Sequence, residues 1–398
     1  MGYRFYSFLI FIMLLPLSGC SVMMLDPLPA DTSPSEILLV IEQSRFAELE
    51  DSLNQYARDI SAEGGSVEIR TFPSSGDPAS LRAMISDRGD SISGSFFVGD
   101  LPAVWYEQNA FGKLEEFPVD LYYMDLDAVW TDSDDDGKYD DHSPLEITHY
   151  VSRITGDNRE LISYFSKLHN YRTGNYSYLG GAFIFKDEDW FDTYRGSSFG
   201  LDRMYESVRI REKAAETLKD DYLYNVAYEG ADYVYQWIHA TPTSLYISDG
   251  SSYSTFRYSE IEQYNTKGRF INMFNCKGAR FTQANLAMAY LNGTDTGLAV
   301  TGSTKVGGNY YPLEFHRTLT AGSSWGNAYK SWYNYFGRSD DEWFLGMIIL
   351  GDPTLRIIDA EVDRTITRNS FSQLVPPDDE TKSRLGEVLI LFDDINLE

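Results

Sequence analysis

Short runs of wholly apolar residues alternate with amphipathic helical patterns along much of this chain. Residues 37–41 are all aliphatic, which is typical of a strand that helices cover on both faces. Apolar residues then recur at spacings of three and four between Phe46 and Ile60, as expected of a helix with one buried face. A second strand and helix pattern follows at residues 66–85. Alternating elements of this size predict an α/β fold with a mostly parallel sheet.

The same alternation returns in the second half of the chain, which suggests two related units. A chain of 398 residues is long enough for one large domain or for two subdomains with tails. We expect one α/β subdomain at residues 36–175 and another at residues 176–360, with helices flanking each sheet. The polar residues 361–398 contain two consecutive prolines and are expected to form a loosely docked tail.

The amino terminus has the pattern of an export signal. Residues 8–15 form an apolar run that is too short to span a membrane. Residues 17–20, Leu-Ser-Gly-Cys, match the lipobox of bacterial lipoproteins, in which cleavage before the cysteine precedes lipid attachment to its thiol. We therefore predict a signal peptide at residues 1–19, a lipid anchor on Cys20 and a tether at residues 20–35. An ordinary secretory peptide or an uncleaved anchor is the alternative.

The net charge of −27 bears on the possible partners. Such acidity argues against nucleic acid and against an anionic membrane surface, because both would repel the chain. Attachment to a membrane is therefore expected to come from the lipid on Cys20. This places the protein in the bacterial cell envelope, facing the periplasm or the cell surface. Acidity is also a common means of keeping secreted proteins soluble.

The densest acidic run lies at residues 132–141. Carboxylates at alternate positions followed by a glycine match the first half of an EF-hand calcium loop, although Ser143 stands where the second half needs a glutamate. Because crowded carboxylates repel one another without a cation, the run predicts a structural calcium site. A solvated acidic turn is the alternative. The expected ligands are the side chains of Asp132, Asp134, Asp136 and Asp140 and the main-chain carbonyl of Lys138.

Two apolar runs end in residues with the chemistry of a cysteine hydrolase. Residues 269–275 lead to Cys276, and residues 233–238 lead to His239. Reactive groups collect at the carboxyl ends of strands in open α/β sheets, and a nucleophilic thiol needs a base. The chain has two cysteines, so lipidation of Cys20 would leave Cys276 as the one free thiol of an exported protein. Such a thiol is either a small buried core residue or a functional group.

Several motifs make the chain resemble the gingipain family of cysteine peptidases, which have a caspase-like fold. The resemblance rests on the order and spacing of these motifs, and it covers residues 37–357. The motifs are Val98-Gly99-Asp100, Asp120-Leu121-Tyr122-Tyr123, Ser152-Arg153-Ile154, the residues 276–281, Thr301-Gly302-Ser303 and the residues 351–356.

The resemblance implies a cysteine endopeptidase that acts on protein or peptide substrates, and the lipobox adds the expectation that it is lipid-anchored. It assigns Cys276 as the nucleophile and His239 as the group that moves the proton. It also assigns the backbone amides of Cys276 and Ala240 as donors to the oxyanion. The family pattern has glycine after the histidine and a small residue before the cysteine, where this chain has Ala240 and Asn275.

These two departures support a second hypothesis, that the protein is a catalytically silent relative serving as a binding or scaffold lipoprotein. A glycan-binding surface protein is a third, suggested by 29 tyrosines and 7 tryptophans. Aromatic residues spread through a large core explain that count more simply.

Overall fold

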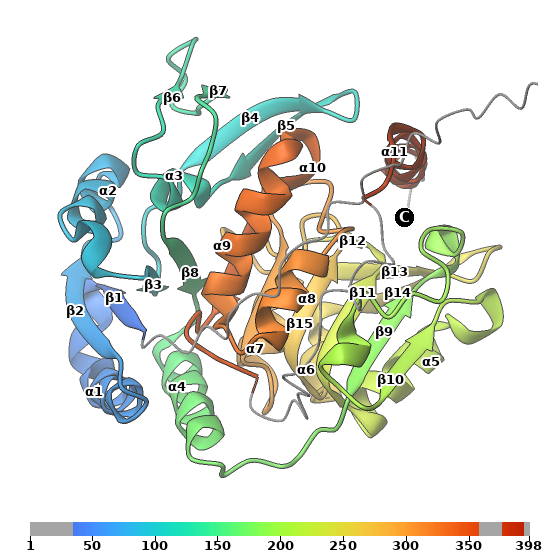
Figure 1. The fold of residues 1–398 in the computed structure, drawn as a ribbon, viewed down its shortest axis with the longest axis horizontal. Coiled ribbons are helices and arrows are strands. Elements are labelled where there is room, and N and C mark those ends of the chain that lie inside the picture. The colour runs from blue at the N-terminus through green and yellow to red at the C-terminus, as the bar shows by residue number, and fades with distance from the viewer. Residues whose placement is uncertain (1–34, 358–375, 394–398) are drawn as a thin grey trace, which may run out of the picture.

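A ten-stranded sheet lies at the centre of the computed structural model, which describes residues 35–357 and 376–393 (Figure 1). Cys20, the predicted signal peptide and all but the last residue of the tether lie outside the described residues. The strand order is β10-β9-β11-β15-β16-β17-β8-β3-β1-β2. The strands are β1 (Glu36–Glu42), β2 (Ser66–Phe72), β3 (Gly94–Val98), β8 (Tyr150–Ile154), β9 (Ala182–Lys186), β10 (Val208–Arg211), β11 (Ala231–Trp237), β15 (Gly268–Phe274), β16 (Ala299–Ser303) and β17 (Met347–Gly351).

The sheet consists of two parallel halves that meet at one antiparallel pair. Strands β2, β1, β3, β8 and β17 run parallel to one another, and so do β16, β15, β11, β9 and β10. The pair β16 and β17 is antiparallel, with Ala299 opposite Gly351 and Ser303 opposite Met347. The two halves therefore direct the carboxyl ends of their strands toward opposite ends of the sheet.

Helices flank this sheet in two groups. Helices α1, α4 and α7 pack in succession, and the ring of Tyr56 on α1 meets Phe165 on α4 at 5.6 Å. Helices α8 and α9 pack against each other, and α9 also contacts β8. The helices are α1 (Phe46–Ala62), α2 (Pro78–Ser86), α3 (Leu121–Met124), α4 (Asn158–Arg172), α5 (Lys219–Leu223), α6 (Tyr258–Gln263), α7 (Leu286–Asn292), α8 (Leu313–Thr320), α9 (Trp325–Tyr335), α10 (Asp341–Phe344) and α11 (Asp379–Asp393).

Three small sheets extend from the connections between the large elements. They are the pair β4 (Trp105–Ala110) and β5 (Lys113–Pro118), the pair β6 (Trp130–Thr131) and β7 (Asp141–His142), and the meander β12 (His239–Thr241), β13 (Ser244–Ser248) and β14 (Tyr253–Arg257). None of the helices within 35–357 and 376–393 is both long and apolar enough to cross a membrane.

This architecture confirms the predicted fold class, a mostly parallel α/β sheet flanked by helices, and it is consistent with a caspase-like fold. Residue 175 lies in the connection between α4 and β9, and the strands before and after it belong to the same sheet. Strand β17 comes from the second half of the chain but pairs in parallel with β8 from the first half.

Arg153 and Asp120 connect strand β8 to the segments beside the sheet. Arg153 on β8 is buried, and its guanidinium contacts the carboxylate of Asp120 at 2.7 to 2.8 Å. The same group donates to the carbonyls of Leu101 (3.1 Å) and Pro102 (2.9 Å) and lies 4.4 Å from the ring centre of Phe281. These partners compensate the cost of burying the charge of Arg153. The Ser152-Arg153-Ile154 motif therefore has a structural role in this chain.

The part of the predicted tail that the structure describes contains a helix. Residues 379–393 form helix α11, in which Leu385 and Leu389 are buried. Leu385, Val388 and Leu389 are spaced by three and four, so they form one apolar stripe on the helix. The high polarity of the segment concealed this stripe.

Candidate active site

His239 and Cys276 follow two neighbouring parallel strands at the same level. In the pairing of β11 with β15, Trp237 lies opposite Phe274, and the amide of Ile238 donates to the carbonyl of Phe274 at 3.3 Å. Each residue comes two positions after that last pair. Both side chains are buried, with exposed fractions of 1% for His239 and 5% for Cys276. The pairing therefore brings the predicted thiol and imidazole to adjacent strand ends in a covered position.

A carboxylate from the next strand reaches the imidazole. Asp189 follows β9, which pairs in parallel with β11 on the side away from β15. Oδ2 of Asp189 lies 3.2 Å from Nε2 of His239, and the ring of Trp190 covers the imidazole at 4.9 Å. Three consecutive strands, β9, β11 and β15, thus deliver a carboxylate, an imidazole and a thiol to one end of the sheet.

The meander that begins at His239 fixes the position of Asp189. The hydroxyl of Tyr253 on β14 donates to Oδ2 at 2.5 Å, and the hydroxyl of Ser248 on β13 donates to Oδ1 at 2.9 Å. Partial burial raises the pKa of Asp189, but the hydrogen bonds from the imidazole and the two hydroxyls outweigh it and hold that pKa below its usual value. The carboxylate is therefore charged at neutral pH and oriented from three sides.

A second aspartate, Asp187, shapes the turn that carries Asp189. Its carboxyl oxygens accept the amides of Asp189 and Ser248, each at 3.2 Å. Complete burial, and then the nearby charge of Asp189, raise the pKa of Asp187 well above its usual value. Asp187 thus joins the end of β9 to β13, while Asp189 is the group that faces the imidazole.

Ala240, one of the two predicted oxyanion donors, lies in extended backbone. It belongs to β12 and pairs with Leu245 on β13. Its φ is outside the left-handed region, whereas Lys277, directly after Cys276, has a φ of 60°. Alanine in place of the family's glycine therefore causes no backbone strain at residue 240.

Asn275, the other departure from the family pattern, is buried beside a glycine. A Cβ on Gly278 would lie 2.3 Å from Oδ1 of Asn275, so the amide fills the space that this glycine leaves. Within the described residues, neither Nδ2 nor Oδ1 of Asn275 has a hydrogen-bond partner. The side chain of Asn275 is thus packed beneath the turn after Cys276.

A buried lysine lies close behind this turn. The carbonyl of Lys305 accepts the amide of Lys277 at 2.9 Å, and its ammonium donates to the carbonyl of Val306 at 2.7 Å. Burial lowers the pKa of Lys305 to about 8, while the charges of Glu115 and of the Cys276 thiolate act to raise it. A cation in this position favours the thiolate form of a cysteine.

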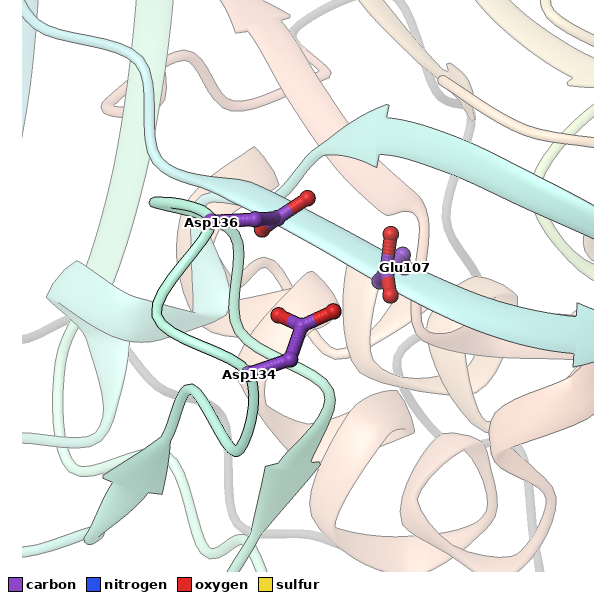
Figure 2. A group of neighbouring side chains, drawn as sticks. All are labelled: Glu107, Asp134 and Asp136. Carbon is purple, nitrogen blue, oxygen red and sulfur yellow. The ribbon is translucent and has the colours of Figure 1, made fainter.

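The predicted calcium loop connects β6 to β7, and only part of its ligand set converges. The carboxylates of Asp134 and Asp136 lie together with that of Glu107 on β4, with one oxygen of each within 4.8 Å of the others (Figure 2). Asp132 instead accepts the amides of Asp136 and Gly137, and Asp140 accepts the amide and hydroxyl of Ser133.

Lys138 takes part in this cluster through its side chain. Its ammonium contacts Asp136 and lies 3.6 Å from Glu107 and 3.2 Å from Glu116. Hydrogen bonds to Asp136 and Glu116 raise the pKa of Lys138 above its usual value, so the ammonium stays charged. Part of the repulsion among the carboxylates is thereby relieved within the protein.

Asp189 and Glu107 were not among the residues predicted from the sequence. Asp189 stands in Asp187-Glu188-Asp189-Trp190, a polar run directly after the apolar strand β9, and this position at a strand end is a usable signal. Glu107 has no such signal, because it reaches the acidic loop only through the pairing of β4 with β5 and its contact with Tyr139.

No protein-family model matches this chain, and no curated protein matches it significantly.

Proposed function

We propose that this protein is a cysteine endopeptidase of the gingipain-like type, acting on protein or peptide substrates. The observation that carries the proposal is the delivery of Asp189, His239 and Cys276 to one end of three consecutive parallel strands. A thiol, an imidazole and an orienting carboxylate are the groups that acyl transfer through a covalent intermediate needs.

In this proposal the imidazole of His239 takes the proton of the thiol, and Sγ of Cys276 attacks the peptide carbonyl carbon. The negative charge that develops on the carbonyl oxygen is stabilised by the amides of Cys276 and Ala240. The C–N bond then breaks, and the imidazolium gives its proton to the leaving amine. Water attacks the resulting thioester with the imidazole as base, which releases the acid and restores the thiol. Asp189 keeps the ring oriented and stabilises the imidazolium.

A silent scaffold lipoprotein is the second candidate, and the burial of both reactive side chains favours it. Side chains of His239 and Cys276 with exposed fractions of 1% and 5% are not open to a polypeptide in this conformation. Digestion of a peptide library by the wild type and by Cys276→Ala, side by side, separates the two candidates. Cleavage by the wild type alone supports the peptidase, and no cleavage by either, together with a Cys276 thiol that alkylating reagents reach freely, supports the scaffold.

We also propose that the chain is held in the bacterial envelope by lipid on Cys20. The Cys20→Ser substitution should move the protein from the membrane fraction to the soluble fraction, because an acidic chain has little affinity for an anionic membrane surface. Fractionation followed by immunoblotting measures this change. A Cys20→Ser variant that stays with the membrane would contradict the lipoprotein assignment.

A structural calcium ion is the third part of the proposal, now with a changed ligand set. Carboxylate oxygens suit calcium, and those of Glu107, Asp134 and Asp136 already converge. The ion would replace the ammonium of Lys138 between them and tie the β6–β7 loop to β4. Asp132 and Asp140 would hold the shape of the loop through its amides.

Calcium should raise the melting temperature of the protein, because a ligand that binds only the folded state adds stability. At a free concentration 100 times Kd the gain is about 2.7 kcal/mol. Differential scanning calorimetry in calcium and in chelator measures it. Glu107→Gln should lose the calcium response, whereas Asp140→Asn should lower the melting temperature in both conditions and keep the response. Identical unfolding curves of the wild type in calcium and in chelator would contradict the calcium site. The carboxylates would then be balanced by Lys138 alone.

A further inference from the structure

Helix α11 extends along the end of the sheet at which Cys276 and His239 lie. In Figure 1 this dark red helix stands apart from the α/β layers, beyond β12 and near α10. Its carboxyl-terminal half packs against the β4–β5 hairpin, where a Cβ on Gly386 would lie 3.5 Å from the ring of Phe111. Leu389 and Ile390 line a cavity of about 90 Å³ together with Phe111, Lys277 and Val306. This half of the helix therefore lies beside the turn that directly follows Cys276.

The amino-terminal half of α11 lies against the opposite side of the same end. Asp378, Thr381 and Arg384 line a cavity of about 300 Å³ together with Asp192 and Tyr194. These last two residues belong to the segment that follows Asp189, the carboxylate beside His239. Pro377, just before the helix, is buried. One helix thus lines one cavity with the segment after Asp189 and another with the turn after Cys276.

We propose that α11 is an autoinhibitory element that occupies the face through which a peptide substrate reaches Cys276. The inference rests on the proposed peptidase function and on the position of α11 beside both the segment after Asp189 and the turn after Cys276. A substrate would enter between the segment after Asp189 and the turn after Cys276 once α11 has left.

The way α11 is attached is compatible with release. Its buried contacts come from one apolar stripe, Leu385, Val388 and Leu389, and its ammonium at Lys382 lies 3.4 Å from Asp340. The side chains of Ser383, Arg384 and Glu387 are exposed. Release of the helix would break these contacts without unfolding a strand of the sheet.

The test measures how fast iodoacetamide alkylates Cys276 in the full-length protein, with peptide mapping by mass spectrometry. Leu389→Asp places a charge in the buried stripe, and Ser383→Asp places the same charge on the exposed face of the same helix. Alkylation of Cys276 should become at least about tenfold faster in Leu389→Asp and remain at the wild-type rate in Ser383→Asp, because the rate follows the population of the open form. An unchanged rate in a folded Leu389→Asp variant overturns the proposal.

A synthetic peptide of residues 376–393, added to Leu389→Asp, separates release of the helix from general loosening of the fold. The peptide should slow alkylation again if α11 covers the site. Fast alkylation that the peptide does not slow overturns the proposal. Peptide hydrolysis, measured in parallel, tests the proposed function separately. Faster alkylation without hydrolysis would support α11 as a cover of the site and contradict the peptidase function. Hydrolysis with an unchanged alkylation rate would support the peptidase function and contradict the role of α11.

Discussion

Replacing Cys276 with alanine should abolish peptide hydrolysis and leave the fold intact. The thiol is the only group in the proposed mechanism that forms the covalent intermediate, so its loss should lower kcat by about 10⁴-fold or more. The stability cost should be about 1 kcal/mol, because the change removes one small atom from a buried position. Hydrolysis of a peptide substrate and thermal unfolding, measured on the same preparation, check both parts.

His239→Ala should cause a loss of the same size, and the double variant should be no worse than either single variant. Groups that act as one unit in a reaction have effects that do not add. His169→Gln is the matched control, since this imidazole is 40% exposed, contacts Asp59 and lies on α4. Its activity should equal that of the wild type. Hydrolysis by Cys276→Ala at more than about 0.1% of the wild-type rate would show that another group performs the reaction.

Asp189→Asn should reduce hydrolysis by about 10² to 10⁴-fold without unfolding the protein. An amide there cannot stabilise the imidazolium, and it favours the wrong tautomer of the ring, which is how loss of an orienting carboxylate acts in other hydrolases. The wild-type carboxylate has a lowered pKa, so its contribution is present at neutral pH and is lost only as the pH falls through that low value. The pH profile of kcat/KM measures this.

Tyr253→Phe supplies a graded comparison for Asp189. It removes the hydroxyl that donates to Oδ2 at 2.5 Å and keeps the carboxylate beside His239. Activity should fall by about tenfold, which corresponds to the loss of one hydrogen bond to a charged group. With that bond gone the pKa of Asp189 rises, so the acid limb of the pH profile should move toward higher pH. Equal activity in Asp189→Asn and the wild type would remove Asp189 from the mechanism.

The central strands could be predicted because their sequences are locally decisive. The run at residues 37–41 is β1, and the run that ends before Cys276 is β15, since wholly apolar runs of this length suit strands buried on both faces. Their order could not be predicted. Strand β17 enters beside β8, and this long-range pairing leaves no local pattern.

The site residues that lie at the ends of strands could be predicted from the sequence. Those that lie in loops could not. His239 and Cys276 follow recognisable strands, but Asp189 lies in an irregular stretch, where short 3-10 turns and a hydrogen-bonded network set its position. The converging carboxylates were predicted within one loop, yet Glu107 joins them from β4. Residues that meet only through the tertiary fold have no fixed spacing in the sequence, so a sequence pattern does not reveal them.

Trapping the covalent intermediate tests directly whether Cys276 is the nucleophile. The protein, in the wild-type form and with Leu389→Asp, is mixed with a peptide substrate, quenched in acid during turnover and mapped by mass spectrometry. The account predicts an acyl group on Cys276 in thioester linkage, present in both forms, more abundant with Leu389→Asp and absent from Cys276→Ala. Cleavage of the peptide with no acyl group on Cys276, or no cleavage and no acyl group in either form, would contradict it.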